Sequence, residues 1–519
     1  MRTVRLIIDN KSVVIQHATP GVIKKLEQAT SYLVRGHYFA PGYKRGFWDG
    51  REHTMVFRKG NYTVPIGLLG VLREVLKEHD VEYELKRRAS PPPPPVKFQW
   101  NKDVVLRPYQ NEAVEAFCAA PERGRGILKM PIRSGKTKTA AGVIHKLGVR
   151  TLFCVPSKML MHQTARSLAE SLPGADIGTI GDGTWQEGDH ITVATVQTLA
   201  RLRGGTKSQC SGNRLRDRSG AWVKGRYEMS TAPCGRKQCD GGHKRTTAMD
   251  PRYPDLIKGY GLVIFDECHH LKGEAWRNVI LSCPSRYRLG LSATVYFDSA
   301  KENETGVIWL RACCGAIKYE VSTSDLIEQG YLMRQHVELY AVREPRGLDG
   351  EKWSAELRNK AIYLNEWRNK FIVLKTIEKL SQGRNVLIVS NRLAQIDAIS
   401  NLLHIYKVEH VTVTGSDPTQ LRDERVGEFT RGNVHVIVGT VFNEGVDIPV
   451  LEVLINAEGG RDVKATVQRM RNMTPAEGKE VAELIDFWDD TNKYFRKHSR
   501  ERAAIYEGES AFIVRKMWE

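Results

Sequence analysis

The stretch GILKMPIRSGKTKTAAGV, residues 126–143, decides how the rest of the sequence is interpreted. Its apolar start predicts a short buried strand, residues 131–135 a turn, and the residues from Lys136 onward a helix. In such a loop, backbone N–H groups and the positive end of the helix face an anion. Gly135 permits close approach, Lys136 supplies a positive charge, and Thr137 offers a hydroxyl to Mg²⁺. The stretch therefore predicts a triphosphate site, although alone it also fits an ordinary strand, turn and helix.

A second segment, GLVIFDECHH at residues 261–270, ends an apolar run in two acids. A buried parallel strand that delivers Asp266 and Glu267 at its carboxyl end places one carboxylate to hold Mg²⁺ and the next to orient or deprotonate water. Two such strand ends in one chain are unlikely to arise by chance. Together they predict hydrolysis of a nucleoside triphosphate.

Composition narrows the class of partner. The chain has 519 residues, of which 41% are hydrophobic, so it can hold about three domains of roughly 150 residues each. Its net charge of +18 favours nucleic acid over a membrane, because no apolar run is long enough to span a bilayer and no lipidation signal is present. General basicity is the alternative. The N-terminus does not read as a signal peptide, and nine scattered cysteines favour reduced thiols and a cytoplasmic location.

Five consecutive prolines, residues 91–95, cannot lie inside a helix or a sheet, and they predict a stiff linker at residues 91–96. The preceding residues, 1–90, read as a small α+β domain with a strand hairpin, a helix over residues 17–33 and a second helix.

Between those helices, basic and aromatic residues interleave on a predicted loop. They could contact phosphates and stack on bases, and we assign this role to Lys44, Arg45, Trp48 and Arg51. The alternative is that Phe47 and Trp48 belong to the core and that the charges form a solvated rim.

Beyond the linker, strands and helices alternate in two series, at residues 97–325 and 326–519. This alternation predicts an α/β fold, in which each series forms a parallel sheet with helices on both faces and binds ligands at the carboxyl ends of its strands.

The motifs LRPYQ, PIRSGKT, VPSKML, ATVQTL, DECH, LSAT, LIVSN, GTVFNEGVDIP and QRMRN occur in this order between residues 105 and 490. The set resembles superfamily 2 helicases of the DEAD/DEAH-like kind. In addition, GFWDGR, VPIGLL and the segment TNKYFRKHSRERAAIYE are similar to the UvsW-type helicases of bacteriophages, which are related to XPB and RecG. The resemblance implies two tandem RecA-like domains, the second with a C-terminal helix. It also implies an ATP-dependent DNA helicase or translocase acting on single-stranded, duplex or branched DNA in the host cytoplasm, during phage replication, recombination or repair.

The resemblance also implies roles for single residues. Gln110, beside Arg107, would read adenine, while Ser134, Gly135, Lys136 and Thr137 would hold the phosphates and Mg²⁺. Asp266 would bind Mg²⁺ and Glu267 would activate water. Ser292 and Thr294 would couple the nucleotide state to DNA contacts, and Gly445 and Asp447 would line the ATP site. Lys158, Gln197, Asn391 and Thr440 belong to motifs that usually contact the nucleic-acid backbone.

Two motifs depart from the family pattern. The phosphate loop has Ile132 and Arg133 where this group commonly has Thr and Gly. The last motif is usually Q-x-x-G-R-x-x-R, but here Gln468 opens QRMRNMTP, so that Arg471 fills the glycine position. Phosphoryl transfer still needs a cation, for which Arg471 is the first candidate and Arg469 the second. An RNA helicase, or a nucleic-acid-binding protein with a degenerate ATPase, remains the alternative function.

An insert at residues 204–250 is rich in Arg, Lys and Gly and poor in apolar residues. It contains three thiols and an imidazole that suit tetrahedral Zn²⁺, namely Cys210, Cys234, Cys239 and His243. The spacing lacks the close CxxC pairs of well-defined zinc sites, so a disordered basic loop is the alternative.

Overall fold

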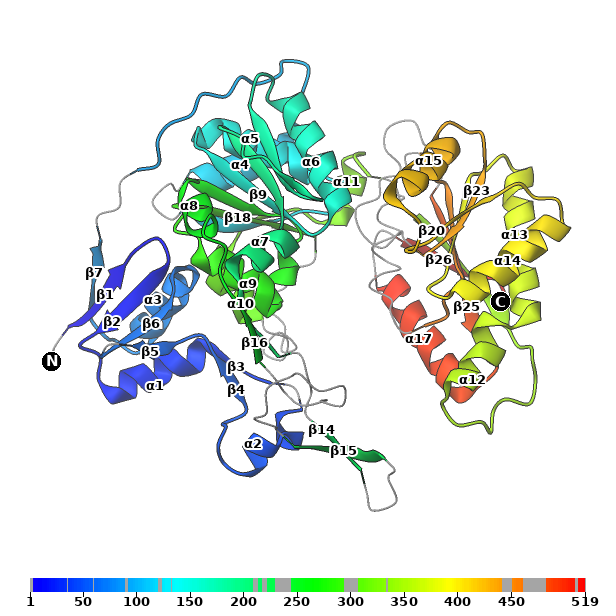
Figure 1. Ribbon diagram of the computed structural model, residues 1–519, viewed down its shortest axis with the longest axis horizontal. Helices are drawn as coiled ribbons and strands as arrows, with labels where there is room; N and C mark the ends of the chain where they lie inside the picture. The colour runs from blue at the N-terminus through cyan, green and yellow to red at the C-terminus, as the bar shows by residue number, and fades with distance from the viewer. Residues whose placement is uncertain are drawn as a thin grey trace. The chain divides into compact units, whose positions relative to one another are not determined.

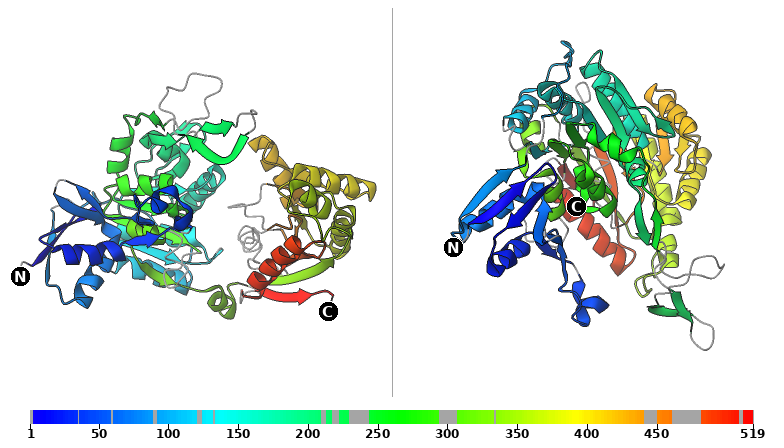
Figure 2. Two further views of the ribbon diagram at one scale, coloured as in Figure 1. Left: turned by 90° about the horizontal axis from the view of Figure 1, so that it is seen from below. Right: turned by 60° about the vertical axis from the view of Figure 1, so that its left-hand side comes forward.

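The computed structural model describes residues 3–34, 36–58, 60–88, 92–119, 124–131, 133–208, 213–216, 222–228, 244–293, 307–332, 335–440, 450–460, 482–508 and 512–518. The chain forms two compact units. The first contains Met1–Lys129 and Thr137–Glu320, and the second contains Met130–Lys136 and Val321–Glu519. Figures 1 and 2 show that each unit is built from a twisted sheet with helices packed against it.

The first unit begins with a small α+β domain. Its sheet has the strand order β5-β6-β2-β1-β7, formed by β1 (Val4–Ile8), β2 (Ser12–Gln16), β5 (Val56–Arg58), β6 (Asn61–Pro65) and β7 (Tyr83–Arg87). Two amphipathic helices, α1 (Pro20–Ala29) and α3 (Leu69–Glu78), bury their apolar sides with this sheet in one hydrophobic core. The expected hairpin and two helices are therefore confirmed.

The first helix is shorter than the sequence predicts. The expectation of a helix over residues 17–33 is wrong at both ends, because Thr19 caps the start and the helix ends at Ala29. Beyond it, β3 (Ser31–Leu33) pairs with β4 (Arg51–His53) in a separate two-stranded ribbon. Pairing with a distant strand thus overrides a helical pattern that sequence periodicity alone would continue.

The larger part of the first unit is an eight-stranded sheet of order β11-β10-β12-β9-β17-β18-β8-β19. Every pair is parallel except β10 with β11. The strands are β8 (Arg125–Lys129), β9 (Thr151–Val155), β10 (Ile177–Gly181), β11 (Thr184–Trp185), β12 (Ile191–Thr195), β17 (Leu262–Phe265), β18 (Tyr287–Ser292) and β19 (Ile317–Glu320). The helices are α4 (Pro108–Cys118), α5 (Lys136–Leu147), α6 (Lys158–Ser171), α7 (Val196–Arg203), α8 (Tyr253–Lys258), α9 (Glu274–Ser282) and α10 (Val307–Cys314), with a 3-10 turn at Cys268–Lys272.

The described backbone of the insert forms two antiparallel ladders. One joins β13 (Gly205–Ser208) to β16 (Lys244–Thr247), and the other joins β14 (Asn213–Arg216) to β15 (Trp222–Glu228). The four candidate zinc ligands lie outside the described residues.

The second unit is a seven-stranded, fully parallel sheet of order β22-β23-β21-β24-β25-β20-β26. Its strands are β20 (Gln335–Val342), β21 (Val386–Val389), β22 (Val411–Val413), β23 (Val436–Gly439), β24 (Val453–Asn456), β25 (Glu483–Asp489) and β26 (Phe512–Lys516). Its helices include α11 (Thr323–Glu328), α12 (Ala355–Arg358), α13 (Glu366–Ser381), α14 (Leu393–Ile405), α15 (Thr419–Thr430) and α17 (Lys493–Glu507). Both sheets confirm the predicted α/β class with two RecA-like domains.

Side chains of the second sheet alternate between two cores. On β21, Leu387 and Val389 enter one core with Tyr506 of α17, whereas Val386 and Ile388 enter the other with residues of α13 and α14. Because successive strand residues point to opposite faces, a continuous apolar run marks a strand covered on both sides. This explains why the valine-rich runs of the sequence become central strands.

The N-terminal domain packs directly on the RecA-like part of its unit. Ala312 of α10 belongs to the N-terminal core, and a Cβ added at Gly67 would lie 2.2 Å from the carbonyl oxygen of Arg311. Glu52 of β4 accepts a hydrogen bond from Trp309 Nε1 at 2.8 Å and pairs with Arg277 at 2.9 Å. The domain limits at residues 90 and 96 stay a prediction, but the N-terminal domain is not held by the linker alone.

A second contact is made by the β1–β2 turn. The guanidiniums of Arg125 and Arg288 both donate to the carbonyl oxygen of Asn10, at 2.8 Å and 3.0 Å. Arg288 is fully buried. One backbone carbonyl of the N-terminal domain therefore serves as acceptor for two cations of the RecA-like sheet.

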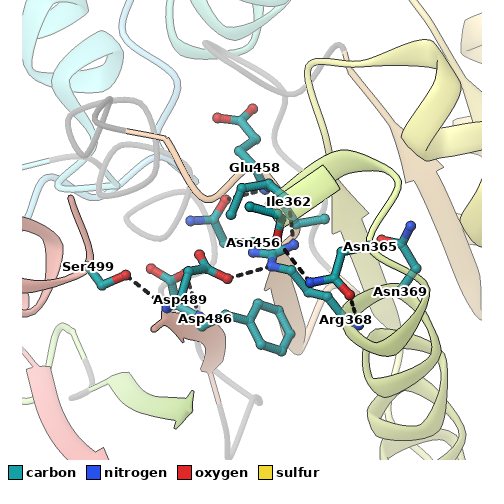
Figure 3. A network of polar contacts seen from close by, with 12 residues as sticks. Ile362, Asn365, Arg368, Asn369, Asn456, Glu458, Asp486, Asp489 and Ser499 are labelled. Atoms are coloured by element: carbon teal, nitrogen blue, oxygen red, sulfur yellow. Dashed lines mark hydrogen bonds and ion pairs between the residues drawn. The ribbon is translucent and has the colours of Figure 1, made fainter. Parts of the chain in front are cut away.

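A buried polar network stabilises the carboxyl end of the second sheet (Figure 3). Arg368 of α13 donates to Asp489 at 2.8 Å and to the carbonyl of Ala457 at 2.7 Å. Arg502 of α17 donates to Asp486 at 2.9 Å and to the carbonyl of Gly460 at 3.0 Å. Burial raises the pKa of the Asp489 carboxyl, and the two guanidiniums oppose that rise. The network fixes the segment that follows β24, just before the divergent QRMRN motif.

We predict that Arg368→Met will destabilise the second unit by about 3–5 kcal/mol, because it leaves the charge of Asp489 buried with one partner fewer. Hydrogen exchange of the β25 amides at several urea concentrations measures this free energy. The matched control is Arg346→Met, which breaks an exposed pair with Glu344 and should have little effect. Equal losses for the two variants would show that the buried pair does not hold this end of the sheet.

Candidate active site

The phosphate loop joins β8 to α5 and is folded by its own polar groups. Ser134 is buried and donates to the carbonyl of Pro131 at 2.6 Å, and Lys136 Nζ lies 3.5 Å from the same oxygen. Arg133 and Gly135 both have left-handed backbones, with φ of 64° and 77°. The family commonly has Gly where Arg133 stands, which agrees with the backbone that this position needs. Arg133 therefore adopts a strained conformation, of the order of 1–2 kcal/mol.

Gln110 is fixed at the start of α4. Its side chain is buried, and its Oε1 accepts a hydrogen bond from the backbone N–H of Arg107 at 2.9 Å. The residue thus has a defined orientation, and the recognition of adenine by its amide stays a prediction.

The two acids stand where β17 ends, beside the neighbouring strands β9 and β18. Asp266 is buried, and its Oδ1 accepts from the backbone N–H of Glu267 at 3.0 Å. Glu267 has a left-handed backbone with φ of 48°, at the point where the chain turns sharply from the strand. The separate roles of the two carboxylates in metal binding and water activation stay a prediction.

His269 connects the acidic motif to the next strand. Its Nδ1 lies 3.2 Å from Glu267 Oε2 and 3.1 Å from the hydroxyl of Ser292, at the end of β18. Because Ser292 is fully buried, its hydroxyl has a fixed position against the ring. Sequence reasoning assigned no role to His269, although its place in DECH was the available signal. The imidazole therefore links the Glu267 carboxylate to the LSAT motif.

Residues expected to contact the nucleic-acid backbone follow neighbouring strands. In the first unit, Lys158 follows β9 and Gln197 follows β12, and both are exposed. Lys158 pairs with Asp182, and this hydrogen bond holds the pKa of the Asp182 carboxyl below its usual value. In the second unit, the exposed Asn391 follows β21, and Thr440, which follows β23, accepts from the N–H of Gly415 at 3.1 Å. Their contacts with nucleic acid stay predictions.

The N-terminal candidates fall into two groups. Lys44 and Arg45 are exposed, whereas Arg51 donates to the hydroxyl and carbonyl of Ser31, at 2.9 Å and 3.2 Å, and so holds β3 to β4. Trp48 donates to the carbonyl of Arg51 at 2.8 Å. The alternative that Phe47 belongs to the core is wrong, because 83% of its surface is exposed.

Several predicted site residues lie outside the described part of the chain, namely Thr294, Gly445, Asp447, Gln468, Arg469 and Arg471. Within the described ranges, His, Cys, Asp and Glu form no cluster of three or more suited to a metal ion. Helices in those ranges are all too short or too polar to cross a membrane.

Comparison with known families agrees with this geometry. Residues 103–297 match the family described as type III restriction enzyme, res subunit, and residues 369–471 match the helicase conserved C-terminal domain. The chain is a superfamily 2 helicase related to UvsW and XPB. The helicase is an enzyme that couples hydrolysis of a nucleoside triphosphate to unwinding, and its family uses ATP and Mg²⁺.

Individual relatives are distant. The helicase is 25% identical over 466 residues to the DNA 3'-5' translocase XPB2 of Sulfurisphaera tokodaii, covering 83% of this chain and 91% of the relative. It is 21% identical to the ATP-dependent DNA helicase uvsW of Enterobacteria phage T4, covering 95% of each chain. Among solved structures, the type ISP restriction-modification enzyme LlaBIII bound to DNA aligns with a TM-score of 0.50 and 15% identity. That alignment covers 74% of this chain and 28% of the other, and it supports the fold alone.

We predict that Lys136→Ala and Glu267→Gln will each abolish ATP turnover while DNA binding survives. The first removes a phosphate contact, and the second removes the carboxylate that orients water. Steady-state phosphate release is the measurement. Lys138→Ala is the matched control, since Lys138 lies on the same helix and contacts only the exposed Glu170 among described ion pairs. Near-normal hydrolysis by either site variant would refute the assignment.

Proposed function

We propose that this helicase is an ATP-dependent DNA translocase that remodels branched or duplex DNA in the cytoplasm of a phage-infected host, during replication, recombination or repair. The observation that carries the proposal is the linked set Glu267–His269–Ser292 at the ends of adjacent strands. It supplies a path from the hydrolytic carboxylate to the LSAT motif. The net charge of +18 supports a nucleic acid as the substrate, and two of the relatives are named as a DNA translocase and a DNA helicase, which supports DNA.

In this proposal, each residue set has a distinct task. Lys136, Thr137 and Asp266 hold the phosphates and Mg²⁺, and Glu267 orients the attacking water. Mg²⁺, when bound, neutralises charge that develops on the phosphoryl oxygens. Thr294 acts with Ser292 to couple the nucleotide state to the DNA contacts.

The remaining contacts come from both units. Gly445, Asp447 and Gln468 contribute to the nucleotide site, and Arg471, with Arg469 in reserve, supplies the cation for the transition state. Lys158, Gln197, Asn391 and Thr440 hold the DNA backbone, together with Lys44 and Arg45 of the N-terminal domain. Arg51 is better explained as a structural residue, because its guanidinium is already bonded to the ribbon.

We predict that DNA will stimulate ATP hydrolysis more than RNA, and that forked or four-way DNA will stimulate it most. Hydrolysis rates with single-stranded, duplex, forked and four-way DNA and with RNA test this expectation. Binding should weaken steeply with salt, because phosphate contacts release counterions. Greater stimulation by RNA would instead identify an RNA helicase, and salt-dependent binding without any stimulation would identify a binding protein with a degenerate ATPase.

Single-turnover rates of ATP hydrolysis by Arg471→Ala and Arg469→Ala show which arginine serves the reaction. The rate should fall by about 10³ in the variant that lacks this arginine.

The insert supports a second proposal, that Cys210, Cys234, Cys239 and His243 bind one Zn²⁺. The flanking ladder β13–β16 brings the two ends of the insert together, and a metal could order the polar sequence between them.

We predict about one zinc per chain after dialysis under reducing conditions, and its release in a Cys234→Ser, Cys239→Ser variant. Elemental analysis is the measurement, and Cys118→Ser is the control. Absence of zinc from the wild-type protein would leave the insert as a basic loop.

A further inference from the structure

The ribbon of β3 and β4 ends in a small lobe, residues 36–50, which we call the aromatic lobe. It contains a 3-10 turn, His37–Phe39, and the short helix α2 (Pro41–Lys44). In Figure 1 the lobe lies beyond the ends of β3 and β4. Its rings are unusually exposed: 83% for Phe47, 71% for Phe39 and 55% for Tyr38. Tyr38 and Phe39 contact each other, with ring centroids 4.3 Å apart, and several exposed apolar rings within one short lobe favour a binding site over ordinary solvent exposure.

The lobe is ordered by contacts that do not bury these rings. Phe47 N–H donates to the carbonyl of Gly42 at 2.9 Å, and Val34 N–H donates to the carbonyl of Gly50 at 2.8 Å, which closes the lobe at its base. The ring of His37 packs edge-on against Tyr43, with centroids 4.6 Å apart. The backbone that carries the exposed rings is therefore folded before a ligand binds, which lowers the entropy lost on binding.

The base of the lobe contacts two helices of the RecA-like part of the unit. Glu52, in the strand that leaves the lobe, pairs with Arg277 of α9 and accepts from Trp309 of α10. Tyr32, in the strand that enters the lobe, also donates to Glu52. These contacts attach the aromatic lobe to the RecA-like part of its unit.

The charge of the lobe favours an anionic ligand. Lys44 and Arg45 are exposed in the same lobe, and Asp49 is the single acid between residues 36 and 50 of the sequence. That carboxylate is occupied by Arg51 N–H at 2.9 Å and by the ring of His53 at 2.8 Å. Exposed aromatic rings and exposed cations within one lobe suit a polymer that carries planar bases and phosphates.

We propose that the aromatic lobe binds unpaired bases where a strand leaves a duplex. Phe39 and Phe47 stack on the bases, and Lys44 and Arg45 hold the adjoining phosphates. The rings require unpaired bases, because a base inside a duplex is already stacked on both faces. This inference rests on the proposed DNA function and narrows it to the junction between single and double strands.

The test is the affinity of the full chain for forked DNA and for blunt duplex of the same length, measured by fluorescence anisotropy without ATP. Phe39→Ala with Phe47→Ala should weaken binding to forked DNA by about tenfold or more, as expected for losing two stacking rings, and leave blunt duplex binding within about twofold. Phe57→Ala is the matched control, since Phe57 is 60% exposed on β5, outside the lobe. Circular dichroism establishes that each variant is folded.

Two further variants separate stacking from other causes. Phe47→Trp should retain the affinity for forked DNA, and its fluorescence should be quenched on binding, whereas Phe47→Leu should not retain that affinity. Equal weakening of forked and blunt DNA, or full affinity in Phe47→Leu, would overturn the proposal. A change from dimer to monomer in the double variant, with unchanged DNA binding, would also overturn it, because the rings would then contact a second copy. If DNA stimulates the wild-type ATPase but the double variant binds forked DNA normally, this inference alone fails.

Discussion

In a parallel sheet that is covered by helices on both faces, few positions allow a polar side chain to reach solvent or a ligand. In the first unit, the central strands β12, β9, β17, β18 and β8 lie side by side and are almost wholly buried. Polar side chains can emerge only where these strands end, and the parallel arrangement brings all those ends to one edge. The ends of the five strands, in that spatial order, carry or are followed by Gln197, Lys158, Asp266, Ser292 and the phosphate loop. Hydrogen bonding of the sheet, more than any local motif, thus places the chemistry.

The same edge also stores backbone strain. Arg133 and Glu267 are non-glycine residues with positive φ, and each follows a strand that pairs with β18. Such conformations persist when the surrounding structure over-determines them. Here the two flanking strands fix where each turn begins, so the side chains leave the sheet in directions that a relaxed backbone would not give. His269 then joins one of these strained residues to Ser292, so that the Glu267 carboxylate is connected to the end of β18.

Sequence patterns were sufficient to predict the features that depend on the spacing of apolar residues and on the order of motifs along the chain. The valine-rich runs predict central strands, and the acids after residues 262–265 predict a strand-end site, because both signals are local. Contacts between distant segments carried no such signal. Residues 31–33 fit a continuing helix until pairing with β4 is known, and Ala312 gives no sign that it completes the N-terminal core. The link through His269 likewise depends on a turn whose direction only the folded sheet fixes.

The two hydrogen bonds to the Asn10 carbonyl have a consequence for the evolution of this protein. Arg125 and Arg288 bind the main-chain oxygen of that turn, not its side chain. Every amino acid supplies the same oxygen, so the identity of residue 10 is free to drift, while either arginine is hard to replace. Turn length is different, because one inserted residue would shift the oxygen by about 3 Å along the chain. The junction between the N-terminal domain and the RecA-like sheet therefore tolerates point substitution at residue 10 but not insertion. Proteins that descend from this chain should vary in the amino acid at this turn and keep the length of the turn.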